Sequence, residues 1–248
     1  MKTVKNLMVA ACGAATLALA RPALADLIVN GGFESTTAGN GQLGYNTGAT
    51  GWSVPAPSGS YSFIFASGTG DTTGANGQYG SLSLWGPNNG SANGLPAASP
   101  AGGNYVASDG DFQPGAISQT ISGLTAGQTY AVSFYWGAAQ QSGFTGPSTE
   151  QWQVSLGAQT QNTAVSSIAS EGFSGWLAST LAFTATSSSE TLSFLAAGTP
   201  SGVPTFALLD GVSMNAVSET PTWLVSAFIL LPVCGHMLRR KMRQQART

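Results

Sequence analysis

The chain has 248 residues, a formal net charge of −2 and only 7% charged residues. From Asp26 to Val217 it contains no lysine, arginine, histidine or cysteine, because these residues all lie near the two ends. This excludes Ser-His-Asp and Cys-His catalysis and a zinc site with nitrogen or sulfur ligands, and the unpaired carboxylates would repel nucleic acid. The carboxylates, hydroxyls, amides and aromatic rings that remain suit the binding of a cation or a sugar.

The first 25 residues have the order of a secretory signal peptide. Lys2 and Lys5 precede an apolar stretch at 7–20, and Ala23-Leu24-Ala25 is a small-x-small cleavage site. We expect residues 1–25 to be removed and the mature chain to begin at Asp26. The alternative interpretation is a buried helix of the fold.

The last 31 residues, 218–248, have the character of a membrane anchor. An apolar helix is predicted at 222–238, and it just reaches the lower limit of about 17 residues for a membrane span. The basic tail at 239–248 would stay cytoplasmic, which agrees with export of the body. We therefore expect an exported protein of the cell envelope or extracellular space, held in the membrane by one C-terminal helix. The alternative is an amphipathic helix that packs on the domain.

The body, residues 26–217, is predicted to be a single all-β domain. Short runs of alternating apolar and polar residues are separated by Gly, Pro, Asn and Asp, which favours a sandwich or barrel. Strands are expected near 27–33, 117–121, 128–136, 152–156, 180–186, 192–194 and 206–214. The glycine-rich stretch 61–100 is expected to be an elaborate loop with a brief strand at 81–85.

Several pieces of the body, in order, resemble the galactose-binding-like jelly rolls found in PEP-CTERM proteins and carbohydrate-binding modules. The pieces are Asn30-Gly-Gly-Phe-Glu34, Gly51-Trp-Ser-Val54, Gly103-Asn-Tyr-Val-Ala-Ser-Asp-Gly110, Ile117-Ser-Gln-Thr-Ile121, Gly123 to Phe134, Trp176 with Phe183-Thr-Ala-Thr186, and Leu209-Asp-Gly-Val-Ser213. The resemblance implies a two-sheet jelly-roll β-sandwich whose first and last strands lie near each other.

The C-terminal segment resembles the PEP-CTERM sorting signal of bacterial envelope proteins. Glu219 and Pro221 precede the apolar span, and Arg239-Arg240-Lys241 follow it. The family motif is Pro-Glu-Pro, whereas this chain reads Ser218-Glu219-Thr220-Pro221. The resemblance implies an exosortase-type sorting protease as a partner, and without such processing the chain would stay anchored.

Asp210 is the most unusual single residue of the predicted domain. It alternates in phase with Phe206, Leu208, Val212 and Met214, which predicts that it points toward the core. A buried carboxylate needs a metal ion or hydrogen-bond donors, since no basic residue is available to pair it. The family resemblance implies a structural calcium ion held by Glu34 and Asp210. The alternative is that Glu34 is a solvated turn residue and that Asp210 caps backbone N–H groups.

The acidic segment Asp109-Gly-Asp111 is a second group of candidate oxygen ligands. It lacks the loop spacing of an EF-hand, and a plain turn is the preferred interpretation.

Two aromatic residues are candidates for ligand contacts. Trp85 ends a short apolar run before Gly86-Pro-Asn-Asn-Gly90, which places it on an expected loop tip. Tyr135 points opposite to Phe134 and would lie on the outer face of its sheet. The other tryptophans of the body are interpreted as core residues.

The preferred function is non-enzymatic: an exported structural or adhesive protein associated with exopolysaccharide, a context that comes from the family resemblance. The alternative is a carbohydrate-binding module with a defined glycan ligand. A third hypothesis is a carboxylate-only glycosidase that uses Glu150 and Glu171, although nothing in the sequence brings these two residues together.

Overall fold

The computed structural model describes residues 26–55, 59–95 and 98–218. The signal peptide and the C-terminal helix with its basic tail, both predicted above, lie outside these ranges. Within them, no helix is long and apolar enough to cross a membrane. The described residues instead form thirteen β-strands, as expected for an all-β domain.

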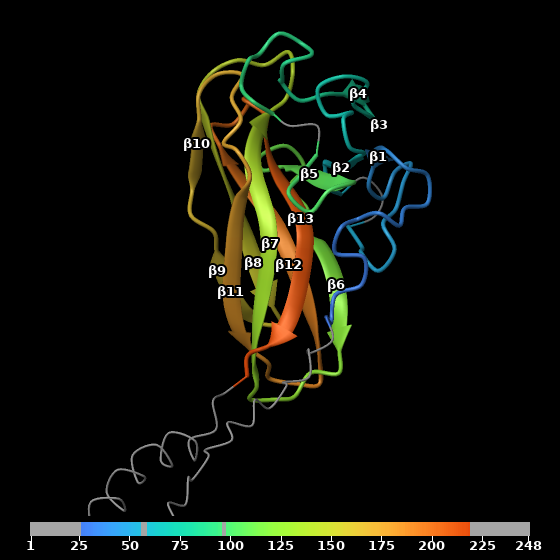
Figure 1. Cartoon of the computed structure of the whole chain (residues 1–248), viewed down its shortest axis with the longest axis vertical. Coiled ribbons are helices and arrows are strands. Elements are labelled where there is room, and N and C mark those ends of the chain that lie inside the picture. Colours follow the sequence, from blue (N-terminus) through green and yellow to red (C-terminus); the bar gives the residue numbers. More distant parts are fainter. Residues whose placement is uncertain (1–25, 56–58, 96–97, 219–248) are drawn as a thin grey trace, which may run out of the picture.

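Two large antiparallel sheets lie face to face along the long axis of the molecule (Figure 1). The six-stranded sheet has the order β1 (Gly41–Gln42), β2 (Ser62–Phe65), β5 (Tyr105–Asp109), β13 (Thr205–Ala216), β7 (Thr129–Gln140) and β11 (Leu177–Thr184). The five-stranded sheet has the order β10 (Ser166–Ile168), β8 (Ser148–Leu156), β12 (Ser189–Thr199) and β6 (Ile117–Ser122), and β9 (Gln159–Asn162) also pairs with β8. A separate hairpin joins β3 (Ala75–Gly77) to β4 (Gly80–Leu82). The fold is therefore a β-sandwich, which confirms the prediction of an all-β sandwich domain.

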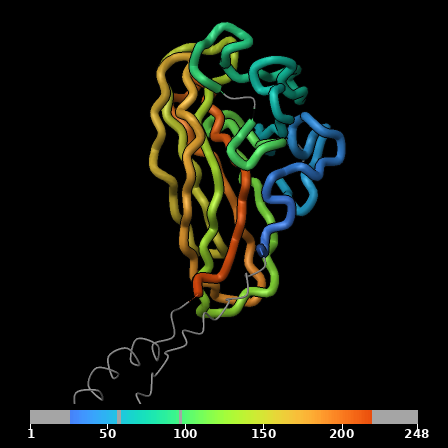
Figure 2. Tube along the Cα trace, viewed as in Figure 1, coloured from blue at the N-terminus to red at the C-terminus, as the bar shows by residue number. Residues whose placement is uncertain are grey.

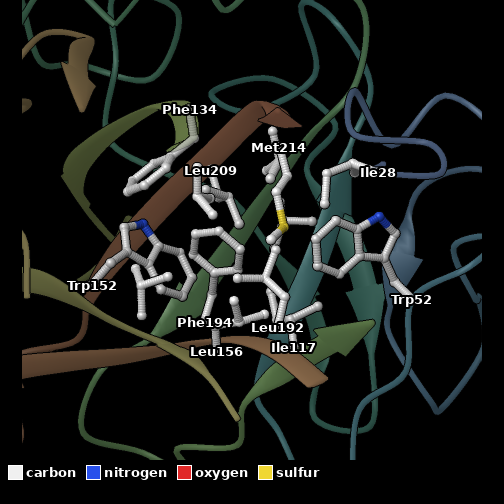
Figure 3. Close-up of a cluster of buried hydrophobic side chains, with 14 of the residues drawn as sticks. Ile28, Trp52, Ile117, Phe134, Trp152, Leu156, Leu192, Phe194, Leu209 and Met214 are labelled. Carbon is white, nitrogen blue, oxygen red and sulfur yellow. The ribbon is translucent and has the colours of Figure 1, made fainter. Parts of the chain in front are cut away.

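The main core lies between the two large sheets. In β7, residues Tyr130 to Trp136 alternate between buried and partly exposed positions, so every second side chain enters the core. Phe194 of β12 lies at its centre, with ring centroids 5.2 Å from Phe134 and 5.9 Å from Trp152 (Figure 3). The indole N–H of Trp152 donates a 2.9 Å hydrogen bond to the carbonyl of Leu208, which ties the two sheets together. The structure thus confirms that Trp136 and Trp152 are core residues.

A second buried cluster covers the outer face of the six-stranded sheet. Its members come from β2, β5, β13 and the segments around β3 and β4; they include Phe63, Phe65, Leu84, Tyr105, Phe206 and Leu208. The chain between Asp26 and β5, coloured blue to teal in Figure 2, lies at one side of the sandwich. Its first part contributes Ile28, Phe33 and Trp52 to the main core, and the part from Tyr61 onward contributes to the second cluster. Residues 61–100 were predicted to be an elaborate loop with a brief strand at 81–85, and a short strand does lie there at Gly80–Leu82. The prediction was wrong in one respect, because Ser62–Phe65 is a fully buried strand of the sheet. Burial on both faces gives such a strand a continuous apolar run instead of alternation.

The predicted opening strand at 27–33 is not formed. Leu27 donates a backbone hydrogen bond to Met214, and Val212 donates one to Gly31, so this segment does run beside β13. However, Asn30 and Phe33 both have positive φ angles, of 54° and 57°, which breaks an extended conformation. The expected nearness of the two ends of the domain is confirmed, while their pairing as strands is not.

The predicted phase of β13 was also wrong. A bulge between Asp210 and Ser213 shifts the register, with Gly211 at φ 59°. Before the bulge, Phe206 and Leu208 face the outer cluster; after it, Val212 and Met214 face the main core. Asp210 therefore shares the outer face with Phe206 and Leu208, and it is fully buried there.

The free edge of β11 is covered by side chains from the other sheet. Gln159 and Gln161 of β9 donate amide hydrogen bonds to the carbonyls of Thr184 and Ala182. These contacts satisfy acceptors that an edge strand would otherwise leave open.

Candidate functional site

A groove of about 470 Å³ opens where several strand ends and turns meet. It lies between Tyr61 beside β2, the β3–β4 turn, the end of β5, the segment after β7 and the segment before β13. Its volume falls within the range of about 300–1,000 Å³ that is typical of small-molecule sites.

Four aromatic rings line the groove: Tyr61, Tyr79, Phe112 and Phe144. Tyr61 is buried, but Tyr79, Phe112 and Phe144 are 63%, 45% and 40% exposed. Ring centroids of Phe112 lie 5.2 Å from Tyr61 and 5.7 Å from Tyr79, so these three rings form one cluster. Large apolar side chains left exposed around a hollow are typical of a surface that contacts a ligand.

Hydrogen bonds from neighbouring side chains fix the hydroxyl of Tyr79 and the backbone of Phe144. Gln113 donates a 3.1 Å hydrogen bond to the hydroxyl of Tyr79 and accepts a 2.6 Å bond from Gln78. Gln113 itself has a φ of 50°, a left-handed conformation that non-glycine residues seldom adopt and that is often found at functional sites. On the other side of the groove, the indole N–H of Trp85 donates a 2.7 Å hydrogen bond to the carbonyl of Phe144. These contacts preorganise the groove before any ligand arrives.

Asp109 provides the most unusual polar group of the groove. Its Oδ1 accepts backbone hydrogen bonds from Asp111 (2.8 Å) and Phe112 (2.9 Å), which confirms the predicted turn. Its Oδ2 has no hydrogen-bond partner among the described residues, although the side chain is only 2% exposed. Burial raises the pKa of Asp109 to about 6, and the charge of Asp111 adds to this effect. Because this unpaired oxygen is itself buried, the carboxylate charge of Asp109 is poorly screened at the edge of the groove.

Asp111 contributes the second carboxylate of the groove. Its Oδ2 accepts hydrogen bonds from the Ser201 hydroxyl (2.8 Å) and the Gly202 N–H (3.1 Å). These bonds connect the turn after β5 to the segment before β13, so Asp111 helps to shape one wall.

Glu150 is fully buried close to Asp109 but does not line the groove. A Cβ atom on Gly110 or Gly198 would lie 2.5 or 2.7 Å from its Oε2, so glycine is needed at both positions. Burial raises the pKa of Glu150 to about 9, and the charge of Asp109 contributes to the shift. Glu150 is therefore a neutral acid at neutral pH.

The hypothetical glycosidase pair is not brought together at one site. Glu171 lies in a different shallow hollow, with a φ of 60°, where its backbone N–H bonds to Gln140. Asp109, not Glu171, is the acid whose charge acts on Glu150.

Glu34 and Asp210, the predicted calcium ligands, do lie near each other. Both carboxylates approach Gly32, and the charge of Glu34 contributes to raising the pKa of Asp210 to about 7, behind the larger effect of burial. Asp210 accepts hydrogen bonds from the Ser99 hydroxyl and, at 2.6 Å, from the Gly211 N–H. Glu34 accepts a 2.8 Å bond from the N–H of Asn104. No group of three or more potential ligand residues (His, Cys, Asp or Glu) surrounds a common point in the described part of the chain. Hydrogen bonds therefore already satisfy Asp210, and calcium binding stays a prediction.

The two predicted ligand aromatics lie outside the groove. Trp85 is partly buried and supports Phe144 instead of lining the site. Tyr135 is partly exposed beside Gly211, on the outer face of the six-stranded sheet as expected.

The aromatic residues of the groove were missed by sequence reasoning, whereas Asp109 and Asp111 had been named as candidate oxygen ligands. Tyr79 lies in a polar glycine-rich turn, where no apolar period marks it. Phe112 gave a clearer indication of the groove in the sequence, because it is an aromatic residue that follows Asp109-Gly-Asp111 at the end of a buried strand.

Comparison with known proteins yields one family and several distant structural likenesses. No curated protein matches the chain. The CBM22-1 xylan-binding domain of Paenibacillus barcinonensis Xyn10C is 12% identical, with a TM-score of 0.40 over 81% of this chain and 100% of that one. A CBM4 structure is 18% identical, with a TM-score of 0.35 over 77% and 99% of the two chains. The N-terminal cellulose-binding domain of Cellulomonas fimi β-1,4-glucanase C is 17% identical, with a TM-score of 0.30 over 47% and 80%.

Likenesses at these scores carry no argument about function. The family comparison is firmer, because the model of a protein family of unknown function, DUF642, matches residues 89–230, more than half of the chain. The matched segment includes β5 to β13 and most of the walls of the groove. On this evidence the chain belongs to the DUF642 family.

Proposed function

We propose that the domain is a carbohydrate-binding module whose ligand site is the aromatic groove. The observation that carries this proposal is the combination of three exposed rings with the two carboxylate residues Asp109 and Asp111 in one groove. A sugar ring offers both matching surfaces: an apolar C–H face that packs on an aromatic ring and hydroxyl groups that donate to a carboxylate. Aromatic walls with a few fixed polar groups are typical of small-molecule sites in general.

The groove supports binding better than catalysis. Glycoside hydrolysis needs two carboxyl groups on either side of the scissile bond. Of the two groove acids, Asp111 is engaged by Ser201 and Gly202, and Asp109 is held by two backbone N–H groups at the end of β5. Each acid thus has one carboxylate oxygen held by donors of the protein, and we propose that the protein is not an enzyme.

The test is glycan binding by variants of the exposed rings. Tyr79→Ala and Phe112→Ala are expected to weaken binding to the best glycan of a panel by about tenfold each, because each removes a stacking surface worth about 1.4 kcal/mol. Tyr45→Ala is the matched control: this tyrosine is 57% exposed and lies outside the groove. Affinity would be measured by isothermal titration calorimetry. The proposal fails if no glycan is retained, or if Tyr79→Ala behaves like Tyr45→Ala.

We propose in addition that the module is exported and held at the cell envelope. The basic-apolar-small order at 1–25 and the apolar span with basic tail at 218–248 support this localisation. An anchored glycan-binding domain would act structurally or adhesively in a polysaccharide layer. The resemblance to the jelly rolls of PEP-CTERM proteins supports this role. Mass spectrometry of the two ends of the mature protein tests the localisation. An intact Met1 would refute export through cleavage, and a chain ending near Pro221 would support removal of the tail by a sorting protease.

A further inference from the structure

The groove carries negative charge that nothing in the domain neutralises. Asp109 and Asp111 both line it, and no lysine, arginine or histidine occurs between Asp26 and Val217. The two acids also act on each other, since the charge of Asp111 contributes to the raised pKa of Asp109. A ligand that brings a positive charge would remove this repulsion.

Asp109 contributes a negative charge that its surroundings screen poorly. One carboxylate oxygen is fixed by the N–H groups of Asp111 and Phe112, and the other has no partner among the described residues. The side chain is 2% exposed, so water solvates this oxygen poorly. A charged donor forms a stronger hydrogen bond to a carboxylate than a neutral hydroxyl does.

The aromatic walls favour the same kind of ligand. Tyr61, Tyr79, Phe112 and Phe144 surround the groove, and the face of an aromatic ring attracts a cation. A groove that combines several aromatic rings with two acids therefore favours an ammonium group over a neutral or anionic one. Uronate or sulfated sugars would meet Asp109 and Asp111 with like charge.

We propose that this groove selects glycans whose sugar units carry a free, protonated amine, with the ammonium group bound beside the carboxylates of Asp109 and Asp111. The ligand class is thus hexosamine polysaccharide without N-acetyl groups. This inference rests on the proposed glycan-binding function of the same groove and names its specificity.

The test compares four oligosaccharides of equal length: glucosamine, N-acetylglucosamine, glucose and galacturonate oligomers. Binding to the full-length protein is measured by calorimetry at about pH 6, near the pKa of Asp109. The glucosamine oligomer is expected to bind about tenfold more tightly than the N-acetylated and neutral oligomers, and the galacturonate oligomer most weakly.

Asp109→Asn is expected to abolish this preference while retaining weak binding common to the uncharged oligomers. Glu190→Gln is the matched control, because it also removes one carboxylate. Glu190 lies at the start of β12, whereas the groove residue Ser201 lies just after the end of that strand. If Asp109→Asn does not fold, the exposed Asp111→Asn removes the other groove charge and is expected to reduce the preference.

The outcomes separate the two proposals. Equal binding of the amine and N-acetyl oligomers overturns the amine selectivity and leaves glycan binding intact. A preference for amine that persists in Asp109→Asn also overturns it, because general charge attraction then explains the binding. Failure of all four oligomers to bind counts against the glycan-binding function itself.

Discussion

Replacing Glu150 by glutamine tests whether a neutral buried acid supports the fold. Glu150 is fully buried and its pKa is raised from 4.5 to about 9, first by loss of hydration and then by the charge of Asp109. The folded protein therefore holds a proton that the unfolded chain has released. This contribution to stability is fully present below about pH 4.5 and is lost as the pH rises toward 9.

The magnitude follows from proton linkage. Each pH unit between the two pKa values lowers the free energy of unfolding by about 1.4 kcal/mol, so Glu150 accounts for a loss of about 4 kcal/mol from pH 5 to pH 8. Glutamine has nearly the same shape and no proton to lose. Glu150→Gln is therefore expected to match the wild type within about 1 kcal/mol at pH 5 and to be more stable by about 4 kcal/mol at pH 8. Asp109 and Asp210 titrate in both proteins, so their contributions largely cancel in the difference.

Urea unfolding followed by tryptophan fluorescence at several pH values measures this difference directly. Glu171→Gln, at a partly exposed position, provides the control for removal of a carboxylate. A difference between wild type and Glu150→Gln that stays constant from pH 5 to pH 8, within an extrapolation error of about 1 kcal/mol, would refute the reasoning. It would mean that water or a cation reaches Glu150 in the folded state.

Two further predictions concern the core and the two acids near Gly32. Phe194→Ala removes the ring that contacts Phe134 and Trp152 and is expected to cost about 3–5 kcal/mol in urea unfolding; a loss below about 1 kcal/mol would contradict the central position of this ring. Calcium in excess is expected to raise the melting temperature of the chelator-treated protein, and Asp210→Asn is expected to abolish that rise. An unchanged melting temperature on adding calcium would exclude the site.

The second half of the sandwich could be predicted well because its strands are half-buried. In β7, β8 and β12, one face meets the core and the other meets solvent, so the sequence alternates and reveals each strand. β2 gives no such pattern, because both of its faces are buried and its polar Ser62 is satisfied by Ser108. Its identity as a strand depends on residues far away in the chain that cover its outer face.

The phase of β13 shows a second limit of sequence reasoning. Alternation is a reliable guide only while the register is unbroken, and the bulge at Gly211 reverses which face the next residues occupy. Asp210 was correctly expected to be buried, but its partners Ser99 and Gly211 could not be deduced from periodicity. The glycine after Asp210 was the available signal, since it permits the positive φ that the bulge requires.

The groove could not be predicted because it belongs to no single element. Tyr79, Asp109 and Phe144 are separated by tens of residues and meet only through the pairing of β2, β5, β7 and β13. Composition did restrict the groups available: carboxylates and aromatic rings are among the side chains that line the groove.

The hydrogen bonds from Gln159 and Gln161 to β11 affect whether copies of the domain can pair through this strand edge. An open strand edge is the place where neighbouring β-proteins fuse into continuous sheets and aggregate. Here Gln159 and Gln161 occupy carbonyls that a foreign strand would need, and they do so with amides that carry no charge. Because these amides carry no charge, salt should not weaken the protection that they give to this edge of the sheet.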